Sequence, residues 1–189
     1  TTVRRCDQRP RGKGAVAAGG IDAPDAVRIG LISDTHGWLD PAVAAHFRGV
    51  DLIVHAGDVG DEAILVTLRA VAPVMAVRGN IDGGALADLP VHAVRDVRGV
   101  RVAALHIAGA PGRPNAAARA LVEAERPDVL VVGHSHVVAF SRHGATLVVN
   151  PGAAGRHGFH DHRTAFVLGR AGGEWQAWRI DLGPRGRPR

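Results

Sequence analysis

The sequence predicts an α/β fold, and three observations support this prediction. From Val27 onward, short runs of Val, Ile and Leu alternate with longer alanine-rich segments, which is the pattern of strands followed by helices. After Gly133 the pattern changes to paired, strand-like runs. The 189 residues are 46% hydrophobic and 22% charged, so the chain can bury a core and is not disordered as a whole.

Five apolar runs predict buried strands, and three other segments predict helices. The strands are Val27 to Ser33, Leu52 to His55, Val74 to Arg78, Val100 to His106 and Val129 to Val132. The helices are Pro41 to Phe47, Glu62 to Val71 and Asn115 to Glu125, with N-caps at Asp40, Asp61 and Asn115.

The last third of the chain predicts two β-hairpins. One joins Val137 to Arg142 with Ala145 to Val149, and the other joins Thr164 to Gly169 with Trp175 to Asp181. A βαβ first half is therefore followed by an antiparallel second half, and no linker divides residues 28–182.

The positive charge of the chain lies in its two ends. Residues 1–27 carry five basic and three acidic groups, and residues 183–189 carry three arginines. Together these two ends account for the net charge of +5. Residues 28–182 hold 15 groups of each sign. We therefore predict a flexible leader over 1–27, one domain over 28–182 and a basic tail over 183–189, without specific nucleic-acid binding.

Cysteine usage and hydropathy indicate a cytoplasmic protein. Cys6 is the one cysteine, so neither an internal disulfide nor a thiolate zinc site can form. No apolar run approaches the roughly 18 residues of a membrane helix, and the leader lacks the apolar segment of a signal peptide. We expect no membrane partner.

Polar side chains that suit a metal ion follow the predicted strands directly. Because loops at the carboxyl ends of strands form the ligand crevice of α/β sheets, we expect these side chains to converge. Carboxylate, amide and imidazole ligands suit Mn, Fe, Zn, Ni or Co, and seven of them exceed what one tetrahedral site uses. The seven candidates are Asp34, His36, Asp58, Asn80, His106, His134 and His136.

The number of ligands indicates two metal ions, and two-metal sites typically catalyse displacement at phosphorus. One carboxylate must bridge the two ions, and Asp58 stands alone on its loop. We therefore expect hydrolysis of a phosphoester.

In their order, these motifs resemble those of the calcineurin-like metallophosphoesterases, most closely the small bacterial and archaeal phosphodiesterase branch. The resemblance covers residues 28–180. It is carried by Asp34-Thr-His36, Gly57-Asp58, Gly79-Asn80, His106, Gly133-His134-Ser-His136 and Asn150-Pro151-Gly152.

The resemblance implies a four-layer αββα sandwich of two mixed β-sheets flanked by helices, the metallo-dependent phosphatase fold. It implies that a bridging hydroxide attacks phosphorus, and that Asn80 also touches the substrate phosphate, so that Asp58 and Asn80 are the expected catalytic residues. One metal would be held by Asp34, His36, Asp58 and His136, and a second by Asp58, Asn80, His106 and His134.

The sequence departs from the family pattern in two places. Many members have a histidine directly after the Gly-Asn pair that protonates the leaving group, and this chain has Ile81. Leaving groups that need little protonation should therefore be favoured. After His106, where members commonly continue with glycine, this chain has Ile107-Ala108-Gly109, which predicts a reshaped loop.

Several polar residues near the motifs carry two interpretations. Asp82 suits a role behind the ligands or a solvated turn, and His55 suits a hydrogen-bonded core histidine first. Arg113 and Arg156 suit exposed loops, with contact to the substrate phosphate as the alternative. A loop with His157, His160 and His162 is predicted as a surface loop near the pocket mouth rather than a third metal site.

The sequence thus predicts a metal-dependent phosphodiesterase with two divalent ions, manganese first, and Ni, Co, Zn, Fe or Mg as alternatives. Its expected partner is a small phosphodiester, and the apolar late strands leave room for a homo-oligomer. One alternative is a non-catalytic or weakly catalytic protein-interaction scaffold, because the same fold resembles a retromer coat subunit. Another is RNA binding through the basic ends, which salt would weaken steeply.

Overall fold

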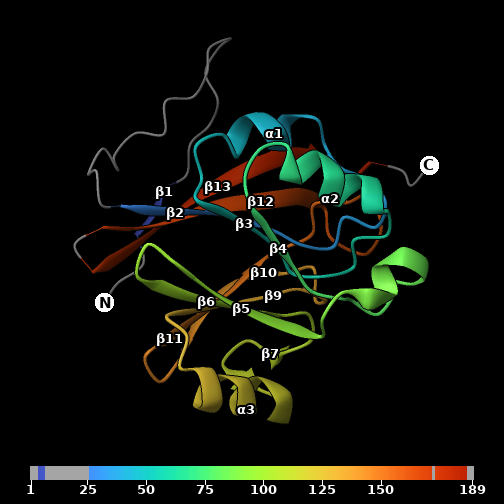
Figure 1. The fold of residues 1–189 in the computed structure, drawn as a ribbon. Helices are drawn as coiled ribbons and strands as arrows, with labels where there is room; N and C mark the ends of the chain where they lie inside the picture. Colours follow the sequence, from blue (N-terminus) through green and yellow to red (C-terminus); the bar gives the residue numbers. More distant parts are fainter. Residues whose placement is uncertain (1–3, 7–25, 172, 187–189) are drawn as a thin grey trace.

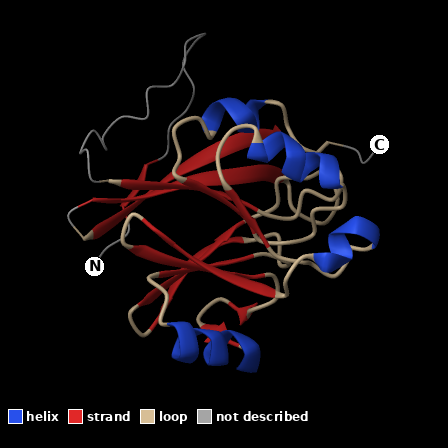
Figure 2. Ribbon diagram, in the orientation of Figure 1, coloured by secondary structure: helices blue, strands red, loops and turns tan. Residues whose placement is uncertain are grey.

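The strands form two large mixed sheets that pack face to face, with helices on the outer side of each sheet (Figures 1 and 2). The structure is a computed structural model, and it describes residues 4–6, 26–171 and 173–186. The α/β sandwich expected from the sequence is confirmed.

The first sheet has six strands, of which the central ones are parallel. Strands β2, β3 and β4 run parallel, whereas β12 is antiparallel to both β2 and β13. The strand order is β1 (Arg4–Cys6), β13 (Glu174–Pro184), β12 (His162–Ala171), β2 (Val27–Ile32), β3 (Leu52–His55) and β4 (Val74–Ala76).

The second sheet has five strands, with antiparallel strands at its two edges. Strands β11, β9 and β6 run parallel, and β10 and β5 pair antiparallel with the strands beside them. The order is β10 (Val138–His143), β11 (Thr146–Pro151), β9 (Val129–Val132), β6 (Val100–Leu105) and β5 (His92–Val97). A small hairpin joins β7 (Gly109–Ala110) to β8 (Arg113–Pro114).

Three apolar clusters hold the four layers together. The largest lies between the sheets and takes alternate side chains of β2 and β12 from one sheet, and of β6 and β9 from the other. A second cluster packs α1 (Ala42–His46) and α2 (Glu62–Arg69) on the first sheet. The third packs α3 (Ala116–Glu125) on the second sheet. Both faces of each central strand are therefore buried, which explains why their sequences are apolar throughout.

Helices α2 and α3 begin directly after the predicted N-caps, whereas α1 begins after Pro41, one residue later than predicted. The side chains of Asp61 and Asn115 accept hydrogen bonds from the Ala63 and Ala118 amides, and Asp40 accepts one from Ala42. These bonds satisfy amides that the first helical turn leaves without a partner. The helix expected over residues 62–71 ends at Arg69, and that expected over 41–47 shortens to Ala42–His46.

The structure adds elements that the sequence analysis did not predict. The edge strand β5 carries Arg95 and Asp96 between its apolar residues, which hides it from a search for apolar runs. A 3₁₀ helix, η1 (Gly84–Asp88), and the β7–β8 hairpin are also new.

The two ends of the predicted domain also extend in the structure. Residues 4–6 of the predicted leader form β1, which pairs parallel with β13. Strand β13 continues to Pro184, two residues beyond the predicted end of the domain. The remainder of the leader, residues 1–3 and 7–25, and the last three residues of the tail lie outside the described residues. Within the described ranges, none of the helices combines the length and the apolar character needed to cross a membrane.

Candidate metal centre

The loops that follow β2, β3, β6 and β9 are joined to one another by backbone hydrogen bonds. The Asp34 amide donates to Gly57 O at 3.0 Å, and the His36 amide donates to Asp58 O at 2.9 Å. On the second sheet, the Gly133 amide donates to His106 O at 3.0 Å. The pairing of the strands thus continues into the loops, which places the predicted ligands side by side.

Most of the predicted ligands have a left-handed backbone. Seven described residues other than glycine have a positive φ, and five of these are predicted ligands: Asp34, His36, Asp58, His134 and His136. This conformation is uncommon for residues with a side chain, and it clusters at functional sites, where the surrounding structure holds it in place. Each of these loops therefore turns sharply and presents its side chain toward the same point.

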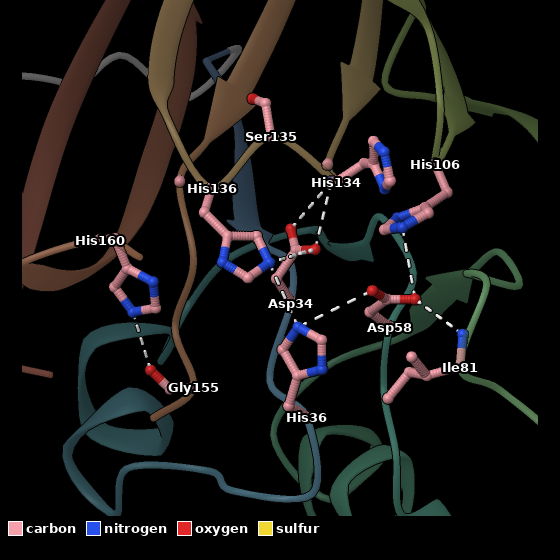
Figure 3. Close-up of polar contacts among 12 residues, drawn as sticks. Asp34, His36, Asp58, Ile81, His106, His134, Ser135, His136, Gly155 and His160 are labelled. Carbon is pink, nitrogen blue, oxygen red and sulfur yellow. Dashed lines mark hydrogen bonds and ion pairs between the residues drawn. The ribbon is translucent and has the colours of Figure 1, made fainter. Parts of the chain in front are cut away.

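Asp34, His36 and His136 form one group of close ligand atoms. His136 Nε2 lies 3.3 Å from Asp34 Oδ1, and the Nε2 atoms of the two histidines are 3.2 Å apart (Figure 3). The buried Asp34 carboxylate also accepts the His134 amide, at 3.1 Å to Oδ1 and 3.2 Å to Oδ2. This bond joins the loop after β9 of the second sheet to the loop after β2 of the first.

The Asp58 carboxylate lies between histidines of both predicted metal sites. Its Oδ2 is 3.7 Å from His36 Nε2, and its Oδ1 is 3.3 Å from His106 Nε2 (Figure 3). Burial would raise the pKa of this carboxyl, but the His106 imidazole and the Ile81 amide outweigh burial and lower the pKa to about 2. Asp58 is therefore a carboxylate at neutral pH, with one oxygen toward each side, which fits a bridging ligand.

His106 is oriented as a ligand by the main chain behind it. Its Nδ1 donates a hydrogen bond of 2.7 Å to Ala56 O, which leaves Nε2 free to bind a cation. The Nε2 atom is buried and, despite its distance from Asp58, has no hydrogen bond. Burial would lower the pKa of His106, but Asp58 and Asp34 outweigh burial and raise it.

The residues present fit divalent cations. Asp34, Asp58 and His106 form a second group of close ligand atoms, which shares Asp34 with the first group. Two buried carboxylates together with imidazoles form a ligand set that Mn, Fe, Zn, Ni and Co accept. The buried Nε2 of His106 has no hydrogen bond, so its lone pair is available to a metal ion.

His134 and Asn80 lie at the edge of these groups. The His134 ring packs edge-on against the His106 ring, with centroids 5.4 Å apart, and the residue is exposed. Asn80 is exposed too, and it is held between two bonded amides, since Gly79 N donates to Asp82 and Ile81 N donates to Asp58. Both residues are therefore placed beside the centre, and their role as metal ligands stays a prediction.

Two glycines leave room for the carboxylates. A Cβ added at Gly79 would overlap Asp58 N and Oδ1, and one added at Gly133 would overlap Ser33 Oγ and press on Asp34 Oδ2. Neither glycine has a positive φ, so these positions need the space rather than the conformation. The Gly-Asn and Gly-His pairs of the sequence therefore follow from close packing between loops.

Asp82 and Asn150 fix the loops from behind the ligands. Asp82 is buried and accepts the Gly60 amide at 2.9 Å and the Gly79 amide at 2.8 Å. Asn150 donates to Gly133 O at 2.8 Å and to Ser135 Oγ at 3.0 Å. Asp82 therefore lies behind the ligands, as the first of its two interpretations predicted, and not in a solvated turn. The Asn-Pro-Gly motif is a signal for Asn150 in the sequence, but it contains no reason to place this residue against the loop of His134.

His55 is a hydrogen-bonded core histidine, as expected. The Thr35 hydroxyl donates its single hydrogen to Val59 O, so it accepts a bond from His55 Nε2 at 2.9 Å. His55 Nδ1 is buried without a partner. Burial lowers the pKa of His55 to about 4, so the ring is neutral at neutral pH.

The histidine-rich loop lies beside the first ligand group. The His157 ring is 5.5 Å from that of His36, and the His160 ring is 5.2 Å from that of His136. His162 instead lies 3.6 Å from Asp181 at an exposed position. The Arg156 guanidinium stacks 3.7 Å from the centroid of the Trp38 ring. Residues 156–160 thus form one border of the centre.

Comparison with known proteins places this chain among metal-dependent phosphoesterases. The domain model of the calcineurin-like phosphoesterase superfamily matches residues 27–171. A probable metallophosphoesterase of Methanocaldococcus jannaschii is 35% identical over 131 residues, which cover 66% of this chain and 67% of that protein.

Solved structures share the fold at lower identity. An archaeal phosphodiesterase superposes with a TM-score of 0.65 at 21% identity, covering 82% of this chain and 100% of that one. Vps29 of Chaetomium thermophilum superposes with a TM-score of 0.63 at 22% identity, covering 77% of this chain and 82% of that one.

The Gly79→Ala variant should lose metal affinity. Because the added methyl group would displace Asp58, we expect the affinity to fall by about tenfold or more. Equilibrium dialysis with metal analysis measures this. Gly83→Ala is the matched control, because a Cβ there meets nothing within 4 Å. Equal metal binding by the two variants would contradict the packing argument.

Titration of His55 should make the metal-free protein less stable in acid. The pKa of His55 is about 4 in the folded protein and about 6.5 in the unfolded chain. At a pH between these two values, the unfolded state therefore binds more protons than the folded state. Stability should therefore fall as the pH drops from about 6.5 to about 4, by roughly 2–3 kcal/mol from this residue. Urea denaturation at pH 7.5 and 4.5 measures the loss. His55→Gln, which cannot titrate, should reduce it, and an unchanged loss would show that other groups are responsible.

Proposed function

Because this chain belongs to the calcineurin-like phosphoesterase superfamily, we propose that it is a metal-dependent phosphodiesterase. One observation carries the proposal: the Asp58 carboxylate lies between His36 and His106, with one oxygen toward each. A carboxylate in that position serves to share two cations. Two-cation centres suit in-line displacement at phosphorus, which is the chemistry of phosphodiester hydrolysis.

We propose a pair of divalent ions, with manganese first among Mn, Ni, Co, Zn, Fe and Mg. When bound, such ions lower the pKa of a water molecule and neutralise charge on the phosphoryl group. Asp34, His36, Asp58 and His136 would hold one ion, and Asp58, Asn80, His106 and His134 the other. The carboxylate and amide oxygens suit manganese, and the imidazoles also suit Zn, Fe and Ni.

The protein's own residues would orient the substrate and the ligands. Asp58 stays ionised because His106 and the Ile81 amide stabilise its charge. Asn80 is exposed beside it, where its amide can donate to a phosphate oxygen. Ile81 offers no proton to a leaving group, so esters with acidic leaving groups should react fastest.

The neutral charge of residues 28–182 supports a small substrate. A polynucleotide is bound mainly through basic side chains along its path, and this region holds equal numbers of basic and acidic groups. We propose that the enzyme acts in the cytoplasm, without a membrane partner. We also propose that the apolar late strands leave room for a homo-oligomer.

The alternative is a protein-interaction scaffold with little or no catalysis. The likeness to Vps29 and the isoleucine after Asn80 favour it. The buried carboxylates argue for catalysis, because a scaffold gains nothing from two desolvated charges. Several Vps29 structures share this fold, and one is a zinc complex from Entamoeba histolytica, so bound metal alone does not separate the two functions.

Hydrolysis of an activated aryl phosphodiester, compared with the matching monoester, tests the proposal. The protein is first freed of metal, and Mn, Ni, Co, Zn or Mg is then added one at a time. We expect metal-restored turnover of the diester, fastest with manganese. Failure with every metal, in a protein that binds ions, would overturn the enzymatic proposal and favour the scaffold.

The Asp58→Asn variant should lose metal and activity together. Removal of the charge that the two ions share should reduce turnover by about a hundredfold or more. Loss of a residue that only hydrogen-bonds to a metal ligand costs less. Diester hydrolysis and metal content are measured on the same samples. Asp96→Asn on the exposed strand β5 is the control, since its ion pair with Arg101 is at the surface. Unchanged metal content and turnover in Asp58→Asn would refute the bridging role.

A further inference from the structure

An apolar groove lies on the outer face of the second sheet, between α3 and β10. Residues 109–112 of the β7–β8 hairpin line one side of the groove, and Figure 1 shows β7 beside α3. Small apolar side chains dominate its lining, among them Ala110, Pro111, Ala118, Val122, Leu130 and Ala139. The groove is partly open to solvent and has a cavity volume of about 30 Å³.

One end of the groove is lined by residues of the loops that carry predicted ligands. Ser135 lines the groove and stands between His134 and His136 in the chain. Asn150 also lines it, and its amide binds Ser135 Oγ and the main chain just before His134. Ala108, on the opposite wall, follows His106 by two residues. The groove therefore continues from the loops that present three predicted ligands.

Exposed apolar side chains surround the same centre. Six large apolar side chains are exposed among the described residues, and four of them lie next to predicted ligands or on the adjoining loop. Ile81, Ile107 and Val137 directly follow Asn80, His106 and His136, and Phe159 lies between His157 and His160. Single exposed apolar residues are ordinary, but this concentration around one site indicates a binding surface.

Charge argues against a polar polymer as the occupant. Ala108, Val132 and Ala139 line the groove together with Ser135 and Asn150, which bind each other, whereas Arg142 and His143 lie at the far end of β10. Arg156, on the border of the centre, is stacked on Trp38. A polynucleotide or sugar phosphate needs basic or hydrogen-bonding groups along its length, and this surface offers apolar contact instead.

We propose that the substrate is a small phosphodiester with at least one apolar ester group, and that the groove binds this group. The inference rests on the proposed phosphodiesterase function. In the reaction, the P–O bond to one ester group breaks, and water supplies the new oxygen on phosphorus and the proton on the leaving alcohol. The apolar group in the groove stays on the phosphate, and the other group leaves.

Substrates with one leaving group and different retained groups test the inference. The metal-loaded full chain is given p-nitrophenyl phosphodiesters whose second ester is methyl, n-hexyl or the 5′-carbon of thymidine. Because the leaving group is the same, differences in kcat/KM between the alkyl esters report binding of the retained group. We expect the n-hexyl ester to exceed the methyl ester by about tenfold or more, with no advantage for the thymidine ester.

Variants that fill the groove test whether the preference for the n-hexyl ester arises there. Ala139→Phe should bring the hexyl-to-methyl ratio close to one while hydrolysis of the methyl ester stays unchanged. Ala110→Phe fills the groove from the exposed β7 and serves where Ala139→Phe does not fold. Ala70→Phe, at the exposed end of α2 on the opposite outer layer, is the matched control and should keep the ratio.

Each other outcome overturns a stated part of the proposal. Equal rates for the methyl and hexyl esters would overturn this inference and leave the phosphodiesterase function intact. Faster hydrolysis of the thymidine ester would overturn it in favour of a nucleotide substrate. A hexyl preference that both groove variants keep would refute the groove as the binding site. No hydrolysis of any diester with any metal would refute the phosphodiesterase function, and this inference with it.

Discussion

The structure depends on two carboxylates that are buried where the two sheets meet. Asp34 is fully buried and Asp58 is 3% exposed, and both lie at the carboxyl ends of strands. An isolated buried charge is costly, so each must be compensated by donors or by cations. The His134 amide compensates Asp34, and the Ile81 amide and His106 compensate Asp58. The contacts made by His134 and His106 connect the second sheet to the first, so the charge of the centre and the packing of the sandwich stabilise the same arrangement.

The left-handed turns and the two close glycines follow from this constraint. A carboxylate can be reached by amides of neighbouring loops only if those loops pass very close to it. Gly79 and Gly133 permit that approach, and Asp82 and Asn150 hold the approaching loops in place. Backbone strain at Asp34, His36 and Asp58 is then offset by bonds made elsewhere in the loops. The metal centre is thus prepared by the protein before any cation binds.

The sequence predicted most of the sandwich and the convergence of the ligands, and it missed what depends on distant packing. Strands such as Leu52–His55 are buried on both faces, so their apolar runs are unmistakable. β5 carries charges because it is an edge strand, and the apolar signal fails there. The groove could not be predicted from the sequence. Its walls come from α3, the β7–β8 hairpin and β10, and they form only when these elements pack together. Likewise, nothing near Asn150 in the chain shows that it supports the loop of His134.

Selectivity for a substrate must come from outside the metal centre. The predicted ligands and the proposed pair of cations would recognise the phosphoryl group, which all phosphoesters share, so they would distinguish one ester from another only weakly. The side chains that differ from the family pattern are Ile81 and Ile107, and both are exposed and apolar. An apolar border lowers the local polarity around a charged centre. A substrate that covers this border with apolar surface would bind more tightly, because its contact removes apolar area from water. The same replacement removes a proton donor beside Asn80. The proposed loss in catalysis of poor leaving groups and the proposed gain in apolar contact would therefore arise from one change in the sequence.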